Sequence, residues 1–197
     1  MVVPAEEAVM KPKTAKQKKF EDQLDAFVDR VEAQVWFTKI IAARFVVDKL
    51  VQFSPIWSGA YIKSHRLGIG RKDRSHEPYI TVEGFESMMA RRLTPSAMIR
   101  VIEYVTDKLK DQAFDIKKNT DYVHITNSIP YGDRVEYLGW SGWSKEGGQV
   151  AMDSTRAYHT YAKARLALIA NKKGILAKAK TNVEKVKSGK YTARQAD

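Results

Sequence analysis

Apolar residues recur at helical spacing over a long stretch near the N-terminus. Successive steps of four, three, four and four residues separate Phe20, Leu24, Phe27, Val31 and Val35. This spacing places their side chains on one face of an α-helix. From Trp36 onward apolar positions leave little of the helix circumference polar, until Pro55 ends the pattern. We predict one helix over residues 20–53, whose second half packs either wholly inside the chain or also against a neighbouring subunit.

Shorter patterns predict the remaining elements. Thr94 and Pro95 are typical of a helix start, because threonine caps the first turn and proline suits the first helical position. Residues 122–129 alternate apolar and polar side chains, which predicts a half-buried strand. We expect a second strand over residues 133–138, antiparallel to the first, and another strand over residues 60–69.

These elements predict an α+β fold, in which a small antiparallel sheet is packed by the long N-terminal helix, a middle helix and a C-terminal helix. Asp153 and Ser154 offer a cap for the C-terminal helix. Short β-like runs at residues 79–82 and 149–152 are candidates for additional strands.

Charge and composition divide the chain into three regions. We predict a flexible basic arm over residues 1–19, one α+β domain over residues 20–171, and a basic extension over residues 172–197 that is at most partly ordered. A weak helix over residues 175–186 remains open. The formal net charge of +11 indicates an anionic partner or solvated basic ends. The candidates for non-specific contact with DNA are Lys11, Lys13, Lys16, Lys172 and Lys173.

Composition excludes several classes of protein. The chain has no cysteine, so it has neither disulfides nor thiol chemistry, which suits assembly in a reducing cytoplasm. It lacks a run of eighteen apolar residues, and we expect neither a membrane partner nor a secretory signal. The four histidines do not have metal-ligand spacing, so we expect no metal and no cofactor. Glu136 is expected to pair with a basic residue across a subunit contact rather than to perform acid–base catalysis, and we predict that the chain is not an enzyme.

The region around residues 122–148 is the strongest candidate for a functional surface. Its last ten residues hold two tryptophans and four glycines. Large aromatic side chains favour burial, and a glycine-rich loop provides little to bury them by itself. We therefore predict an assembly surface, in which a second subunit receives these side chains. The predicted interface residues are Trp140, Trp143, Glu136, Tyr137 and Tyr131, with Trp36 and Phe37 from the long helix.

Two sequence blocks resemble the signature of tail-completion, or head–tail joining, proteins of long-tailed bacteriophages. The later block has Asn127, Pro130 and Tyr131, followed by Glu136 and Gly139. In the family the pattern is Asn, a short apolar step, Pro-Tyr, and then an apolar-Glu-aromatic-Gly run before a glycine-rich loop.

The earlier block spans residues 53–64. The family has a small residue and proline, then Thr-Gly, an apolar residue two positions later, and serine five positions beyond the glycine. Gly59 and Ser64 match this pattern, whereas Ser58 replaces the threonine and Tyr61 replaces an apolar residue that is usually leucine.

The resemblance implies a virion structural protein of the neck, which is in the host cytoplasm during assembly. Members of this family are small α+β domains that form rings around the DNA channel, and the resemblance leads us to expect a hexamer. The implied partners are further copies of the chain, the connector on the head side, and a tail-terminator or tail-tube protein. The alternative is a cellular protein that binds nucleic acid without sequence preference, because the net charge alone is compatible with it.

Overall fold

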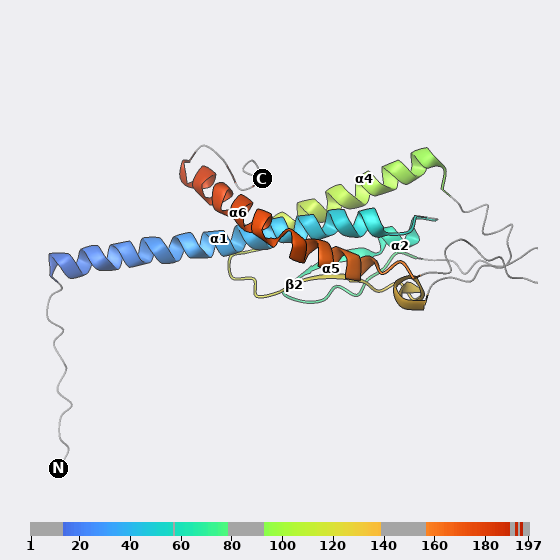
Figure 1. Cartoon of the computed structure of the whole chain (residues 1–197), viewed down its shortest axis with the longest axis horizontal. Helices are drawn as coiled ribbons and strands as arrows, with labels where there is room; N and C mark the ends of the chain where they lie inside the picture. The colour runs from blue at the N-terminus through green and yellow to red at the C-terminus, as the bar shows by residue number, and fades with distance from the viewer. Residues whose placement is uncertain are drawn as a thin grey trace, which may run out of the picture.

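The structure is a computed structural model that describes residues 14–56, 58–78, 93–138, 157–189, 192 and 194. Its elements in chain order are α1 (Ala15–Phe53), α2 (Ala60–Lys63), β1 (His65–Ile69), α4 (Pro95–Gln112), η1 (Ala113–Asp115), β2 (Val123–Asn127), η2 (Arg134–Leu138), α5 (Thr160–Ala170) and α6 (Lys172–Lys187). A long N-terminal helix, a middle helix and C-terminal helices pack together with a two-stranded antiparallel sheet (Figure 1). The predicted α+β class is therefore confirmed.

Helix α1 is longer than predicted. It has 39 residues, which corresponds to about 58 Å of helix. It begins before residue 20 because Thr14 and Gln17 form a capping box, in which each side chain bonds the backbone N–H of the other residue. Residues 15–19 of the predicted arm are thus helical. The helix ends at Phe53, as predicted from Pro55.

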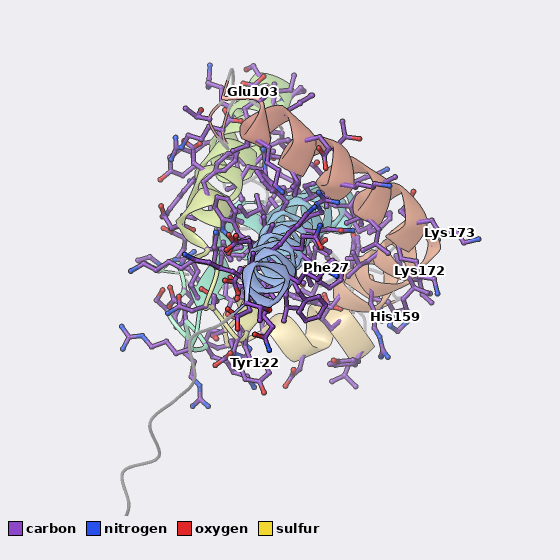
Figure 2. The ribbon with its side chains drawn as sticks, turned by 90° about the vertical axis from the view of Figure 1, so that its left-hand side faces the viewer. Phe27, Glu103, Tyr122, His159, Lys172 and Lys173 are labelled. Atoms are coloured by element: carbon purple, nitrogen blue, oxygen red, sulfur yellow. The ribbon has the colours of Figure 1, made fainter. Side chains whose placement is uncertain are left out.

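The second half of α1 is the centre of the core and is covered on two sides. On one side it packs against α4 and the sheet, through buried residues that include Ile40, Val47, Leu67 and Leu109. On the other side Phe37 and Ile41 pack against α6. Figure 2 looks along α1 and shows α4 and α6 on different sides of it. These contacts favour the expectation that this half of α1 is internal.

The sheet pairs two segments that are far apart in sequence. β1 and β2 are antiparallel, with His65 opposite Asn127 and Ile69 opposite Val123. The predicted strand over residues 60–69 is instead the helical turn α2 followed by β1. Gly59 permits this turn because it has a φ of 79°, in the left-handed region.

The predicted strand over residues 133–138 is wrong, because these residues form the π-helical turn η2. After β2 the backbone closes tight turns, with Gly132 N–H bonded to the Ile129 carbonyl and Val135 N–H to that of Tyr131. Val135 is thereby buried against Tyr61 and Ile129. A segment of six residues is too short for its apolar positions to distinguish a strand from one helical turn.

Helix α4 confirms the predicted middle helix, with Thr94 accepting the Ala97 N–H and proline in its first turn. Helix α6 lies in the region that was expected to be a basic extension, ordered at most in part. Ile175, Ala179 and Val183 follow one another at steps of four and are buried against α1. The boundary expected after residue 171 therefore falls between two packed helices, and the helix left open over residues 175–186 is present.

Several predicted features lie outside the described residues. These are the β-like runs at residues 79–82 and 149–152, the caps Asp153 and Ser154, and Gly139, Trp140, Trp143, Lys11 and Lys13. Among the helices that the structure describes, none is long and apolar enough to cross a membrane.

Candidate assembly interface

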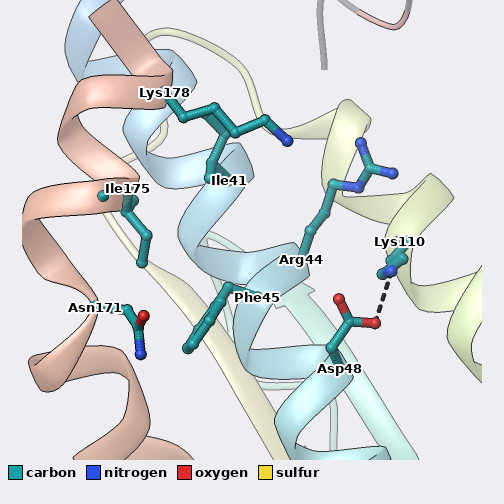
Figure 3. A pocket seen from close by; sticks show the side chains of 9 residues that line it. Ile41, Arg44, Phe45, Asp48, Lys110, Asn171, Ile175 and Lys178 are labelled. Atoms are coloured by element: carbon teal, nitrogen blue, oxygen red, sulfur yellow. Dashed lines mark ion pairs between the residues drawn. The ribbon is translucent and has the colours of Figure 1, made fainter.

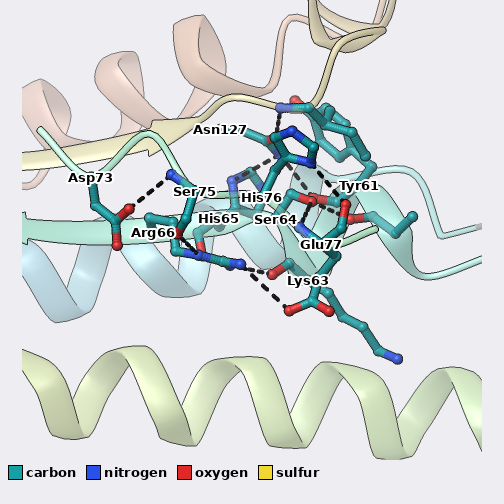
Figure 4. A network of polar contacts seen from close by, with 12 residues as sticks. Tyr61, Lys63, Ser64, His65, Arg66, Asp73, Ser75, His76, Glu77 and Asn127 are labelled. Carbon is teal, nitrogen blue, oxygen red and sulfur yellow. Dashed lines mark hydrogen bonds and ion pairs between the residues drawn. The ribbon is translucent and has the colours of Figure 1, made fainter. Parts of the chain in front are cut away.

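The two sequence blocks that resemble the phage family meet in space. The Tyr61 hydroxyl donates to Glu136 Oε1 at 2.5 Å, although the residues are 75 positions apart in the chain. The Asn127 amide donates to the Tyr61 carbonyl at 2.8 Å. Asn127 Oδ1 also accepts the Ile129 N–H and thereby shapes the turn after β2. Figure 4 shows Asn127 and Tyr61 at one end of a polar network. The blocks thus form one structural unit.

Glu136 lies at the inner end of this unit. It is buried, and its second carboxylate oxygen accepts the backbone N–H of Tyr161 at the start of α5. Burial, followed by the hydrogen bond to Glu136, raises the pKa of the Tyr61 hydroxyl well above its usual range. Burial and the same carboxylate raise the pKa of Tyr161. Both tyrosines are therefore neutral donors at physiological pH, and Glu136 joins η2, α2 and α5 within one chain.

His65 continues the network beneath Tyr161. Its ring is 1% exposed, and burial, with a smaller effect of Arg66, lowers its pKa to about 3. The Ser54 hydroxyl donates to the Leu50 carbonyl at 2.6 Å, so it accepts from His65 Nε2 at 2.7 Å. His65 Nδ1 then accepts from the Tyr161 hydroxyl at 3.0 Å. Because Nε2 is the donor here, it is not placed to remove the proton of Ser54, and the pair fastens α1 to β1.

Ser64 fastens the segment that follows β1. Its hydroxyl donates to the Ala60 carbonyl at 2.7 Å and accepts the Glu77 N–H at 3.0 Å. Arg66 donates to the Lys63 carbonyl and to Ser75, and it reaches the Glu77 carboxylate at 3.4 Å. Figure 4 shows these side chains along β1. The segment from Gly59 to Ser64 is therefore the helical turn α2 with its two caps, and Ser64 at its end holds the loop that contains Glu77.

The remaining residues of the two blocks differ in burial, because Gly59 is buried whereas Ser58 and Pro130 are exposed. Ser58 is exposed, and its hydroxyl accepts the Ala60 N–H at 3.4 Å. A Cβ on Gly59 would lie 3.2 Å from Leu93 Cδ1, so this glycine also permits close packing. Pro130 is exposed in the turn after β2, and Tyr131 is half-buried against the small cluster around Tyr61.

Two residues predicted for the subunit interface are internal instead. Phe37 is 1% exposed because α6 covers it. Glu136 is 7% exposed because Tyr61 and α5 enclose it. Trp36 is half-buried between the two core clusters, and its Nε1 donates to the Ile116 carbonyl. Tyr137 is 69% exposed and remains available to a partner.

In the first half of α1, the apolar face that the helical spacing predicts is exposed, although it was not among the predicted interface residues. We define the α1 stripe as Phe20, Leu24, Phe27, Val28, Val31 and Val35, which are 42–64% exposed. Figure 1 shows this half of α1 projecting beyond the other helices and the sheet. Helical spacing predicts the stripe, but spacing carries no information on whether another element covers it.

The basic candidates are spread over the molecule. Lys16 lies in the first turn of α1, at the tip of the projecting half, and is exposed. Lys172 and Lys173 begin α6 and point away from α1 (Figure 2). The structure therefore does not bring these lysines together.

A different basic surface lies between α1, α4 and α6. A hollow of about 310 Å³ is lined by residues that include Arg44, Lys110 and Lys178. Lys110 pairs with Asp48 at 2.6 Å, while Arg44 and Lys178 point into the space between the helices (Figure 3). Burial lowers the pKa of Lys178, and the nearby charges of Arg44, Lys185 and Lys110 lower it further. The arrangement can attract an anionic group.

The described residues include no cluster of histidine, aspartate and glutamate that could hold a metal ion. A second hollow, of about 300 Å³, opens beside Tyr61 and Glu136 and is bordered by Lys72 and Arg74. No family model, no curated protein and no solved structure matches this chain.

Proposed function

We propose that this chain is a structural protein of a bacteriophage neck, which joins the tail to the connector on the head side as part of a ring around the DNA channel. The observation that carries the proposal is the meeting of the two family-like blocks through Tyr61, Asn127 and Glu136. Two weak sequence resemblances that occupy one structural unit support a common origin better than either resemblance alone.

The α1 stripe supports a role in assembly. Monomeric proteins rarely expose a long contiguous apolar surface, and such a surface is typical of a binding site. The Phe20 and Phe27 side chains are 64% and 60% exposed on a projecting helix. An isolated helical segment gains little stability from propensity alone and is normally stabilised by packing. A protein partner for this half of α1 is therefore part of the proposal.

The proposed partners are further copies of the chain in a ring, for which we expect six subunits, the connector, and a tail-terminator or tail-tube protein. Tyr131, Tyr137, Trp140 and Trp143 remain the predicted interface residues outside α1. The exposed lysines, which include Lys16, Lys172 and Lys173, would tolerate DNA passing through without reading its sequence.

The experiment that tests this function locates the chain in the phage that encodes it. Gold-labelled antibody against the chain is expected to mark the junction of head and tail in electron micrographs. Particles assembled without the chain are expected as separate filled heads and complete tails, and resupplying the purified protein should join them. Label elsewhere on the particle, or normal joining without the chain, contradicts the proposal.

A second candidate is a cellular protein that binds nucleic acid without sequence preference. The basic hollow between α1, α4 and α6 favours it, because Arg44, Lys110 and Lys178 converge there. Binding of the isolated protein to short duplex DNA, measured over a series of salt concentrations, separates the two candidates. Tight binding near physiological salt, lost in Lys178→Glu, would favour this second function.

A further inference from the structure

We propose that the α1 stripe docks on the exposed face of α5 and α6 in a second copy of this chain, so that copies join head to tail. The inference rests on the proposed function only in assuming that the chain self-assembles. It names the two surfaces that meet, and it is tested on the purified protein without reference to a virion.

The receiving surface consists of the exposed apolar side chains of α5 and α6. We define the α5–α6 patch as Leu166, Ile169 and Leu176, which are 67%, 51% and 48% exposed. Leu166 and Ile169 are three residues apart and share a face of α5. Ala164, Ile175 and Val183 of the same helices are buried in the chain's own core, and Leu176, seven residues before Val183, lies at the edge of the buried face of α6 with 48% of its surface exposed. The patch is therefore free to meet a neighbour while α5 and α6 remain packed.

Charge decides which surface suits the α1 stripe. Residues 21–32 hold five acidic residues and one arginine, a net charge of −4 within a chain of net charge +11. Glu21, Asp25 and Glu32 follow steps of four and seven, so they lie along one flank of the stripe. A partner with basic residues around an apolar centre would complement this flank.

The α5–α6 patch has this character. Residues 160–187 hold eight basic residues and one glutamate, a net charge of +7. Lys173 and Lys180 are exposed and lie three and four residues from Leu176, so they border the patch on α6. Figure 2 shows Lys173 pointing outward from α6. Pairing the α1 stripe with a second stripe would instead bring two acidic segments together, which opposes association.

The size of the contact is sufficient for a weak interface. Six side chains of the α1 stripe, about half exposed, offer roughly 500 Å² of surface, because a buried aromatic side chain covers about 150–250 Å². Both partners together then bury about 1,000 Å², near the lower limit for a specific interface. A head-to-tail contact leaves one stripe and one patch free at the ends, so it continues until a ring closes or a filament forms.

Sedimentation velocity on the full chain, over micromolar to several-hundred-micromolar concentrations, tests this contact with charge-reversed variants. Asp25→Lys with Glu32→Lys changes the stripe, and Lys173→Glu with Lys180→Glu changes the patch; all four residues are exposed. Each pair of changes is expected to weaken self-association by about tenfold. An equimolar mixture of the two variants is expected to associate again, because each then offers the other an oppositely charged surface.

Matched controls reverse the same number of charges on α4. Glu103→Lys with Asp107→Lys, and Arg100→Glu with Lys108→Glu, alter exposed residues away from both surfaces and should leave association within about twofold. Circular dichroism of every variant is the check that each variant is folded.

Three outcomes overturn the proposal. The first is a wild-type chain that is monomeric at all concentrations. The second is weakening by the stripe variant alone, which indicates stripe-to-stripe pairing or a different partner surface. The third is weakening by both variants without recovery in the mixture. Each outcome leaves the neck function to be decided by labelling of the virion, so the two proposals can fail separately.

Discussion

Acidification is expected to destabilise the protein through His65. The ring is 1% exposed, and its pKa is lowered from the usual 6.5 to about 3. Between these values the unfolded chain binds a proton at His65 and the folded chain does not. Folding stability from this residue is therefore fully present above pH 6.5 and is lost progressively as the pH falls toward 3.

The magnitude follows from the two pKa values. Each pH unit below 6.5 removes about 1.4 kcal/mol, so about 2 kcal/mol is lost between pH 7 and pH 5. This is a large part of a typical domain stability of about 5–15 kcal/mol. The loss has a structural cause, because a protonated ring would need a new acceptor at Nδ1, where the Tyr161 hydroxyl now donates.

The assay compares urea unfolding of the wild type and His65→Gln at pH 7, 6 and 5. The glutamine amide can still donate to Ser54, and we expect the variant to be less stable than the wild type at pH 7. Because glutamine does not titrate, the variant loses less unfolding free energy on acidification. The difference in unfolding free energy between the two proteins should shrink by about 2 kcal/mol from pH 7 to pH 5. His76→Gln, in an exposed loop, controls for the loss of one histidine. A difference that stays constant with pH would refute the reasoning.

Three further substitutions test the packing. Tyr61→Phe removes the donor to the buried Glu136 carboxylate and should lower the unfolding free energy by about 1.5–3 kcal/mol in urea titrations; a loss below about 0.5 kcal/mol would show that the bond is not formed. Phe37→Ala should cost about 3–5 kcal/mol because α6 covers this ring, whereas Phe27→Ala on the projecting half should change the same free energy by at most about 0.5 kcal/mol. Equal losses of unfolding free energy in Phe37→Ala and Phe27→Ala would contradict the burial of the second half of α1. Gly59→Ala should lower the melting temperature by several degrees, corresponding to about 1–2 kcal/mol, since the glycine has a φ of 79°; an unchanged melting temperature would argue against the left-handed turn.

The helices with strong periodic or capping signals could be predicted from the sequence. The apolar steps from Phe20 to Val35 and the crowding beyond Trp36 indicated α1, and Thr94-Pro95 marked the start of α4. These signals are local, because a cap or an amphipathic face involves residues within a few turns of one another. The same is true of β2, whose alternation was long enough to identify a strand.

The conformation of short segments depended on residues that are distant in the sequence. Residues 133–138 and 60–63 had apolar positions compatible with a strand, but they form turns that bury Val135 and Tyr61 against each other. Periodicity over so few residues is ambiguous, and the tertiary contact decides which conformation is stable.

The direction in which each candidate residue faces was also a property of the tertiary structure alone. The polar Glu136 and the apolar Phe37 could each have contacted another subunit. Instead, Tyr61 of the same chain bonds Glu136, and α6 covers Phe37. The stripe through Phe27 has as regular a pattern as a core helix, yet it remains exposed. Sequence determines which face of a helix is apolar through the helical repeat, whereas the burial of that face depends on which distant segments pack against it.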